Sequence, residues 1–433
     1  MRLLASQVAE ATGGTLVGPD VELDGASFDS RTTRPGQLFV PIVADRDGHE
    51  FIGAAAERGA PAHLTSRPAG LPASAGTAIV VRDTSAALMD LAAWARRRLD
   101  IPVVGITGSV GKTSTKDLVA AALGATRTVT ANERSFNNEQ GLPVTILGAP
   151  DGAEALVVEM GMRGFGEIAR LCAVAAPTVG VVTAVAASHT GRVGGIEGVA
   201  LAKRELVEAL PGSGTAVLNA DDRRVAAMAA HTRASVVTYG TAGDVRCHGV
   251  VLDELARASF RVDTPWGGGH VALAVSGEHM VANAAAAIAV AGVVEGRVDA
   301  ALAALATARL SAMRMQVDRA ATGAIVVNDA YNANPDSMLA ALSALAAMRA
   351  TRRVAVLGPM AELDDPAAGH RAVVDEARRR GIEVIAVGTD LYGIEPVDDP
   401  VAALGPLGDG DAVLVKASRV GGLERVAAAL LGP

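Results

Sequence analysis

The chain has 433 residues, of which 50% are hydrophobic and 20% are charged. This composition supports several buried cores and predicts two to four domains. The formal net charge of -8 argues against a nucleic-acid-binding surface, because such surfaces gather lysine and arginine. Two cysteines are too few for a disulfide framework or a four-cysteine zinc site. We therefore expect a protein of the reducing cytoplasm.

No membrane insertion or export is expected. The first ten residues carry a charge and polar side chains rather than the long apolar core of a secretory signal. An uncharged run, "LCAVAAPTVGVVTAVAAS" at 171–188, reaches the length of a membrane helix. Because Pro177 interrupts this run, we interpret it as the end of a helix followed by a buried strand.

Short Val/Ile runs alternate with Ala-rich segments of helical length along the chain, which is typical of parallel sheets with crossover helices. The predicted fold is therefore α/β, with domains at 1–98, 99–312 and 313–433. The helical "LAAWARRRLD" at 91–100 closes the first domain, and "AIVVNDA" at 324–330 is predicted to be the first strand of the third. The Ala-rich "VANAAAAIAVAGVV" at 281–294 is interpreted as a tightly packed helix.

A glycine-rich motif follows the first strand of the second domain. The order of "VVGITGSVGKTSTKDLVAAAL" at 103–123 is strand, glycine-rich turn and helix, and such a turn presents free N–H groups and a positive helix end to an anion. Its spacing departs from the common phosphate-binding loop, whose first glycine would fall on Ile106. The alternative is a plain turn with an exposed lysine. The predicted nucleotide-binding residues are Gly108, Ser109, Val110, Gly111, Lys112, Thr113 and Ser114. Lys112 would reach the terminal phosphates, and the Thr113 hydroxyl would bind Mg²⁺.

Three further side chains follow this loop in a suggestive order. Glu159 ends the buried strand "ALVVE", and His189 follows the strand "TVGVV". Ligands of doubly wound sheets bind at these carboxyl ends of strands. Taken alone, Glu159 could cap a helix, His189 could be an ordinary loop histidine, and Lys203 in "GVALAKREL" could be a solvated helix lysine.

Together these motifs resemble the Mur ligases, ATP-dependent amide-forming enzymes of peptidoglycan precursor synthesis. The segment "GSVGKTS" is similar to the phosphate-binding loop of that family, which is shorter than the common one. This similarity explains why no glycine stands at position 106. The resemblance implies ATP and two Mg²⁺ ions as cofactors, with Glu159 and His189 as magnesium ligands beside Thr113. It also implies that Lys203 is carbamylated, which would convert a cation into an oxygen ligand suited to Mg²⁺.

Other segments resemble the MurF type, which adds D-alanyl-D-alanine to a UDP-N-acetylmuramoyl tripeptide. They are "SFNNEQGLPVTIL", "NDAYNANPDSM" and, in the first domain, "FDSRTTRPGQLFV" with "DGHEFI". The resemblance implies a UDP-sugar-binding first domain, a central ATPase-type P-loop domain and a Rossmann-like third domain that binds the dipeptide. The substrate-binding residues it implies are Ser30, Arg31, Asn137, Asn138, Asn332, Asn334, Asp336 and Ser337. A second interpretation of "NPDS" is the start of a helix capped by Asn334 or Asp336.

The resemblance also assigns the rest of the ATP site. Asn283 would hydrogen-bond adenine, Arg314 would lie near the γ-phosphate, and Asp329 would hold the ribose. The implied catalytic residues are Lys112, Lys203, His189 and Arg314. The chain departs from the family pattern at Ala184, Met280 and Met313, which bears on nucleotide affinity rather than on the type of reaction.

The implied activity is ATP-dependent ligation through an acyl phosphate by a cytoplasmic monomer. Within the ligases, the tripeptide synthetase stays an alternative, although "YNANP" argues against it. Folylpolyglutamate synthetases lack such a first domain, and the relative that amidates lipid-linked precursors needs four zinc-binding cysteines. A different class of alternative is a nucleotide-dependent switch or a non-catalytic ATP-binding protein.

Overall fold

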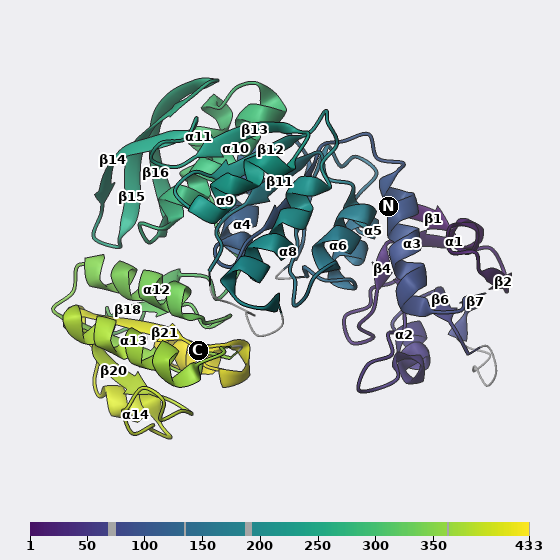
Figure 1. Cartoon of the computed structure of the whole chain (residues 1–433). Coiled ribbons are helices and arrows are strands. Elements are labelled where there is room, and N and C mark those ends of the chain that lie inside the picture. Colours follow the sequence, from purple (N-terminus) through teal and green to yellow (C-terminus); the bar gives the residue numbers. More distant parts are fainter. Residues whose placement is uncertain (68–74, 134–135, 187–192, 362, 433) are drawn as a thin grey trace.

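The computed structural model describes residues 1–67, 75–133, 136–186, 193–361 and 363–432, and these form three α/β domains in chain order (Figure 1). Each domain has its own largely parallel sheet, which confirms the predicted fold class. The first domain contacts the central domain through α3 (Thr84–Arg96), which packs against α5 (Gly141–Leu147) and α6 (Glu167–Ala175). The exact domain boundaries stay predictions.

The first domain is built on a five-stranded sheet of order β2-β7-β6-β5-β4, in which only the β2–β7 pair is antiparallel, and on a separate β1–β3 pair. Its elements are β1 (Arg2–Leu4), α1 (Ala5–Thr12), β2 (Thr15–Val17), β3 (Glu22–Asp24), β4 (Ala26–Ser27), β5 (Leu38–Phe39), α2 (Ile52–Glu57), β6 (Ala62–Thr65), β7 (Thr77–Val80) and α3.

The central domain is built on a six-stranded parallel sheet of order β13-β12-β11-β8-β10-β9. Its strands are β8 (Val103–Thr107), β9 (Val129–Ala131), β10 (Ala155–Glu159), β11 (Val179–Val182), β12 (Thr215–Asn219) and β13 (Ser235–Tyr239). Its helices are α4 (Lys112–Gly124), α5 (Gly141–Leu147), α6 (Glu167–Ala175), α8 (Ile196–Glu208), α9 (Arg223–Ala227), α10 (Met280–Glu295) and α11 (Asp299–Leu305).

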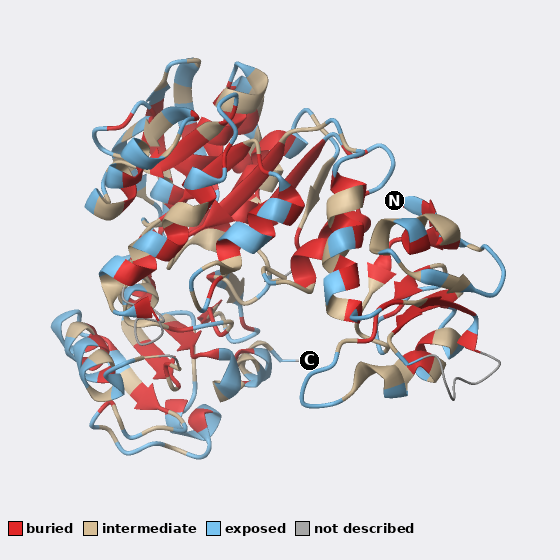
Figure 2. Ribbon diagram, turned by 45° about the vertical axis from the view of Figure 1, so that its right-hand side comes forward, coloured by how far each residue is buried: buried red, intermediate tan, exposed pale blue. Residues whose placement is uncertain are grey.

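The inner strands β8, β10 and β11 of this central sheet are buried on both faces, as Figure 2 shows. Successive side chains of a strand point to opposite faces, and accordingly Val104 and Ile106 of β8 pack with α4 and α10, whereas Val103 packs with α5, α6 and α8. Such strands read as continuous apolar runs because no residue faces water. The predicted helix at 281–294 is confirmed as α10, which packs against α4.

A second sheet in the central domain was not predicted. Three antiparallel strands, β14 (Arg246–Leu252), β15 (Arg257–Thr264) and β16 (Gly267–Ser276), stand between β13 and α10. One face of this sheet supplies Phe260, Val262 and Val271 to the same core as α10. The expected β/α alternation therefore fails in this part of the chain.

The third domain has a five-stranded sheet of order β17-β18-β21-β19-β20. Its elements are β17 (Gln316–Arg319), β18 (Ile325–Asn328), α12 (Pro335–Ala347), β19 (Arg352–Leu357), α13 (Pro366–Arg379), β20 (Glu383–Ala386), α14 (Pro400–Leu404), β21 (Asp411–Lys416) and α15 (Glu424–Leu431). The prediction that the first strand of this domain lies at 324–330 is wrong, because β17 comes first and pairs antiparallel with β18.

The run at 171–188 folds as predicted over its described part. Helix α6 ends at Ala175, and β11 begins at Val179 and is buried throughout. Among the described residues, no helix combines the length and the apolar character needed to cross a bilayer.

The close packing of α10 generates a stability prediction. Ala287 is fully buried, so Ala287→Leu forces a larger side chain into a filled core and is expected to cost about 1–3 kcal/mol. For a domain of this size, that cost lowers the midpoint of thermal unfolding by several degrees. The matched control is Ala282→Leu on the exposed side of the same helix, which we expect to leave the midpoint unchanged. Equal midpoints for the two variants would contradict the observed packing.

Candidate functional site

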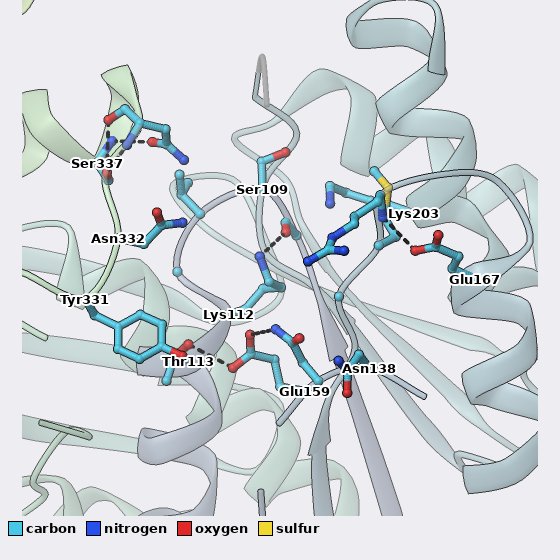
Figure 3. Close-up of a pocket in the computed structure, with 18 of the residues that line it drawn as sticks. Ser109, Lys112, Thr113, Asn138, Glu159, Glu167, Lys203, Tyr331, Asn332 and Ser337 are labelled. Carbon is cyan, nitrogen blue, oxygen red and sulfur yellow. Dashed lines mark hydrogen bonds between the residues drawn. The ribbon is translucent and has the colours of Figure 1, made fainter. Parts of the chain in front are cut away.

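A pocket of about 440 Å³ lies where the central and third domains meet (Figure 3). Its volume is in the range of small-molecule sites. In Figure 3, Tyr331, Asn332 and Ser337 of the third domain lie on the opposite side of the phosphate loop from Lys203 and Glu167. The lining residues that the argument uses are Gly108, Gly111, Lys112, Thr113, Asn137, Asn138, Glu159, Arg163, Lys203, Arg314, Tyr331, Asn332, Asn334 and Ser337.

The loop between β8 and α4 has the geometry of an anion site. Helix α4 starts after Gly111, and no side chain caps its first N–H groups, which leaves them for a ligand. Gly111 adopts a φ of 80°, a conformation that glycine accepts without strain. A Cβ atom on Gly108 would lie 1.8 Å from Thr183 Oγ1, so this position also needs glycine.

The two residues that follow β11, Thr183 and Ala184, fix the shape of the loop. The Ser109 N–H donates to the Ala184 carbonyl at 2.8 Å, and the Thr183 hydroxyl donates to the Val110 carbonyl at 2.6 Å. Ala184, one of the departures from the family pattern, therefore still serves the loop through its backbone. Lys112 Nζ donates to the Gly108 carbonyl at 2.8 Å, so the ammonium group lies across the mouth of the loop.

Two oxygen groups lie side by side next to the loop. The Thr113 hydroxyl donates to Glu159 Oε2 at 2.8 Å, and Asn137 Nδ2 donates to Glu159 Oε1 at 2.7 Å. Glu159 is almost fully buried, at the end of β10 as predicted. No cluster of three or more His, Cys, Asp or Glu was found among the described residues. A Mg²⁺ ion shared with phosphates needs only one or two protein carboxylates, so the Thr113–Glu159 pair fits such an ion.

Lys203 is buried rather than solvated. Its side chain, on α8, is 3% exposed and reaches the pocket, which overturns the alternative of an ordinary surface lysine. Burial, together with the positive charge of Lys112, holds the pKa of Lys203 well below its usual value, because both disfavour the charged form. The side chain therefore tends toward a neutral amine, which is nucleophilic.

The third domain reaches the loop through Arg314. Arg314 Nη2 donates to the Thr113 hydroxyl at 3.2 Å, and the guanidinium lies 4.3 Å from the centre of the Tyr331 ring, a cation–π contact. Beyond Tyr331, Asn334 caps α12 by accepting the Ser337 N–H at 2.9 Å, which confirms the predicted helix start. Asn332 and Ser337 line the pocket with it.

Several predicted site residues lie away from this pocket. Ser30, Arg31, Asn283, Asp329 and Asp336 are not among its described lining residues. Asn283 is nevertheless beside the loop, because its Oδ1 lies 2.8 Å from the place of a Cβ on Gly111. Asp329 instead accepts a hydrogen bond from the Met315 N–H at 3.0 Å and pairs with Lys416 at 2.5 Å. His189 lies outside the described residues, so its predicted role stays a prediction.

Comparisons with known proteins identify the family. Residues 106–291 match the Mur ligase middle domain, and residues 313–419 match the model described as "Mur ligase, glutamate ligase domain". A UDP-N-acetylmuramoyl-tripeptide--D-alanyl-D-alanine ligase of Mycobacterium tuberculosis is 38% identical over 100% of this chain and 98% of its own length. The chain belongs to the Mur ligase family. The ligase of the same name from Escherichia coli is 35% identical over 90% of this chain and 86% of its own length.

Solved structures of Mur ligases have the same architecture. A crystal structure of MurF from Acinetobacter baumannii has a TM-score of 0.88 at 26% identity, over 100% of this chain and 99% of that one. MurF ligase from Thermotoga maritima in complex with ADP has a TM-score of 0.79 at 27% identity, over 93% and 96% of the two chains.

One wall of this Mur ligase's pocket was missed from the sequence. Arg163, Glu167 and Arg170 follow Glu159 and line the pocket, with Glu139 on the facing loop. The Arg170 guanidinium pairs with Glu139 at 2.7 Å, and the Arg163 N–H donates to Glu167 at 2.7 Å. The only sequence signal was their position after a strand end, which many surface residues share.

The phosphate loop generates a second prediction. Gly111→Ala places a side chain at positive φ, which costs about 1–2 kcal/mol, and drives its Cβ toward Asn283. We expect a lower unfolding midpoint and roughly tenfold weaker ADP binding by calorimetry. Gly124→Ala at the other end of α4 is the control, since its Cβ would meet no atom within 4 Å. Unchanged ADP affinity in Gly111→Ala would contradict phosphate binding by this loop.

Proposed function

We propose that the protein is an ATP-dependent ligase that joins D-alanyl-D-alanine to UDP-N-acetylmuramoyl tripeptide. The names of its relatives, at up to 38% identity over the whole chain, support this activity. The structural observation that carries it is one pocket in which the phosphate loop, Glu159 and the buried Lys203 face the Tyr331–Ser337 segment of another domain. Such a pocket can hold the phosphates of ATP between the reacting groups of two different substrates.

The UDP-linked substrate would extend from the first domain to this pocket. Phe28, two residues before Ser30, contacts Phe136 with ring centres 5.7 Å apart. Phe136 directly precedes Asn137 and Asn138 of the pocket. Ser30 and Arg31 would therefore bind the uridine-diphosphate end, with the guanidinium suited to phosphate, while the peptide end reaches the loop. Asn332, Asn334, Asp336 and Ser337 would bind the dipeptide from the other side.

ATP would bind with its phosphates on the loop. The MurF complex with ADP supports nucleotide binding in this fold. Residues 108–114 would hold the phosphates, Asn283 would contact the adenine, and Asp329 would contact the ribose. Lys112 and Arg314 would bring positive charge to the γ-phosphate, where negative charge develops during transfer.

The reaction then needs no nucleophile from the protein. An oxygen of the tripeptide carboxylate attacks the γ-phosphorus, and the bond from this phosphorus to the β-phosphate oxygen breaks. ADP departs as the leaving group, and the tripeptide becomes an acyl phosphate. The neutral amine of the dipeptide attacks the acyl carbon, phosphate leaves, and the amine loses a proton to form the amide. Lys112 and Arg314 stabilise the first step, and the two flanking domains position the reactants and exclude water.

Thr113 and Glu159 would hold Mg²⁺, with His189 a predicted further ligand. A bound Mg²⁺ would neutralise phosphate charge and orient the transferred group. In its neutral form, the amine of Lys203 would attack CO₂, forming an N–C bond and releasing one proton, and the resulting carbamate would supply oxygen ligands. Lysine is required here, because arginine stays charged in proteins.

Two alternatives make different predictions. Folylpolyglutamate synthase of Mycobacterium tuberculosis is 19% identical with a TM-score of 0.61, a likeness that concerns the fold alone. A non-catalytic Mur-like protein would bind ATP without substrate-dependent phosphate release. The retained Lys112, Glu159 and Lys203 favour catalysis.

The deciding assay measures phosphate release from Mg-ATP with UDP-N-acetylmuramoyl tripeptide and D-alanyl-D-alanine. We expect release only when both substrates are present, together with a UDP-linked pentapeptide detected by mass spectrometry. Leaving out each component in turn is the control. The assay is run with two tripeptides, whose third residue is lysine or diaminopimelate. The proposed function would be rejected if the protein binds ATP but releases no phosphate with either tripeptide.

Lys203→Ala is expected to lower kcat by on the order of 10²–10³, because it removes the carbamate that orients the metal and phosphates. Short carboxylic acids should restore part of the rate, whereas bicarbonate should not. Arg204→Ala is the control, since this neighbour on α8 forms a partly exposed pair with Glu208. Wild-type turnover in Lys203→Ala would contradict the assignment.

The modification itself can be observed directly. The chain has only four lysines, at 112, 116, 203 and 416, so ¹³C NMR in ¹³C-bicarbonate has few candidate amines. One carbamate signal is expected in the wild type and in Lys112→Met. Its persistence in Lys203→Met would place the carbamate on another amine.

A further inference from the structure

The segment Ser311–Met315, which joins the central and third domains, is attached twice to one helix. Near its start, Ser311 bonds to Asp117, and near its end, Arg314 bonds to Thr113. Both partners lie on α4, four residues apart, and side chains at this spacing are neighbours on one face of a helix. The segment therefore runs along the first turns of the helix that carries the phosphate loop.

The contact of the segment with Asp117 has more hydrogen bonds than its contact with Thr113. The Ser311 N–H donates to Asp117 Oδ2 at 2.6 Å, and the Ser311 hydroxyl donates to Oδ1 at 3.0 Å. Lys116 Nζ lies 2.9 Å from the same Oδ1, and the Asp117 side chain is only 11% exposed. Hydrogen bonds to a charged acceptor are stronger than neutral ones, and poor exposure reduces competition from water.

The backbone beyond Ser311 needs such support. Met313 and Met315, on either side of Arg314, adopt φ values of 60° and 47°, a conformation that is rare and costly for residues other than glycine. On the far side, the Met315 N–H is held by Asp329 at 3.0 Å. Arg314 is therefore displayed between two carboxylates that each accept a backbone N–H, Asp117 before it and Asp329 after it.

We propose that Asp117 is a positioning residue that places Arg314 over the phosphate loop. The inference rests on the proposed function, in which Arg314 meets the γ-phosphate of ATP. Asp117 itself touches neither substrate nor phosphate, and it is not among the described lining residues of the pocket. It acts by fixing the start of the linker, so that the guanidinium three residues later is held at Thr113 before ATP binds.

Asp117 is also connected to the site through Lys116, and the effect of this connection has to be distinguished from the effect on Arg314. Lys116 also donates to the Asn132 carbonyl at 2.7 Å, and Asn132 Oδ1 accepts the N–H of Glu159 at 2.6 Å. Loss of Asp117 could therefore disturb Glu159 through Lys116. Ser311→Ala removes one bond of the linker and leaves the Lys116–Asp117 pair intact, so it isolates the route through Arg314.

The experiment compares Asp117→Ala, Ser311→Ala, Arg314→Ala and the double variant Asp117→Ala/Arg314→Ala. In each, calorimetry gives the dissociation constants of ADP and of a non-hydrolysable ATP analogue, and the ligase assay gives kcat. We expect Asp117→Ala to weaken the analogue about tenfold and to lower kcat at least tenfold, with ADP affinity unchanged within twofold. Ser311→Ala should show a smaller loss of the same kind. The double variant should match Arg314→Ala within twofold, because residues that act as a unit are not additive.

The chain offers a matched control in the first domain. Asp20 accepts the Ser6 N–H at 2.8 Å and the Ser6 hydroxyl at 2.7 Å, the same pair of bonds far from the pocket in sequence. Asp20→Ala should leave both dissociation constants and kcat unchanged. Circular dichroism and the unfolding midpoint of every variant establish that it is folded.

Three results would overturn the proposal. The first is an unchanged ratio of analogue affinity to ADP affinity in Asp117→Ala. The second is a double variant whose loss of analogue affinity is the product of the losses in Asp117→Ala and Arg314→Ala. The third is the full loss of analogue affinity in Asp117→Ala with no loss in Ser311→Ala. The last two assign the effect to Lys116 and Glu159. The binding ratio needs no ligation, so a wild-type protein without ligase activity would reject the proposed function while the ratio still decides the role of Asp117.

Discussion

The structure depends on one constraint, a helix that begins with unsatisfied N–H groups at the carboxyl edge of a parallel sheet. Helix α4 has no side-chain cap, and Gly111 lets the backbone turn directly into it. Every other feature of the site is placed relative to this helix end: Glu159 on the neighbouring strand, Lys112 across the loop and Arg314 from the next domain. The positive end of the helix dipole and two cations make it a strong site for phosphates.

The few lysines of the chain are concentrated at buried positions. Of 39 basic residues, only four are lysines, and three of them, Lys116, Lys203 and Lys416, are nearly fully buried. Arginine keeps its charge under almost all conditions and suits exposed ion pairs, whereas lysine is compact and can become neutral when buried. Lys116 and Lys416 each have a carboxylate partner, while burial and Lys112 lower the pKa of Lys203. Burial also lowers the pKa of Lys416, but Asp329 opposes that shift, whereas burial and Lys112 act in the same direction on Lys203.

Local patterns made the fold class and the loop predictable from sequence. The strand, turn and helix around Gly111 are contiguous, and the capping role of Asn334 depends on residues within four positions. Contacts between segments that are far apart in the chain could not be predicted from the sequence. Ser311 and Asp117 are 194 residues apart, and the place of Arg170 in the wall of the pocket depends on how α6 packs. The β14–β16 sheet was not predicted because its strands have one exposed face. They also interrupt the alternation of strands and helices on which the predicted elements were based.

The departures from the family pattern also acquire a physical meaning at the linker. A glycine in place of Met313 would accept a φ of 60° freely, whereas methionine is strained there by on the order of 1–3 kcal/mol. A more flexible linker would let the third domain sample many orientations, each of which moves Arg314. A strained linker held at both ends allows fewer orientations, so less conformational entropy is lost when the domains close on ATP. In this chain, the positions of Met313 and Asp117 therefore favour a preorganised site, at the expense of freedom between the domains.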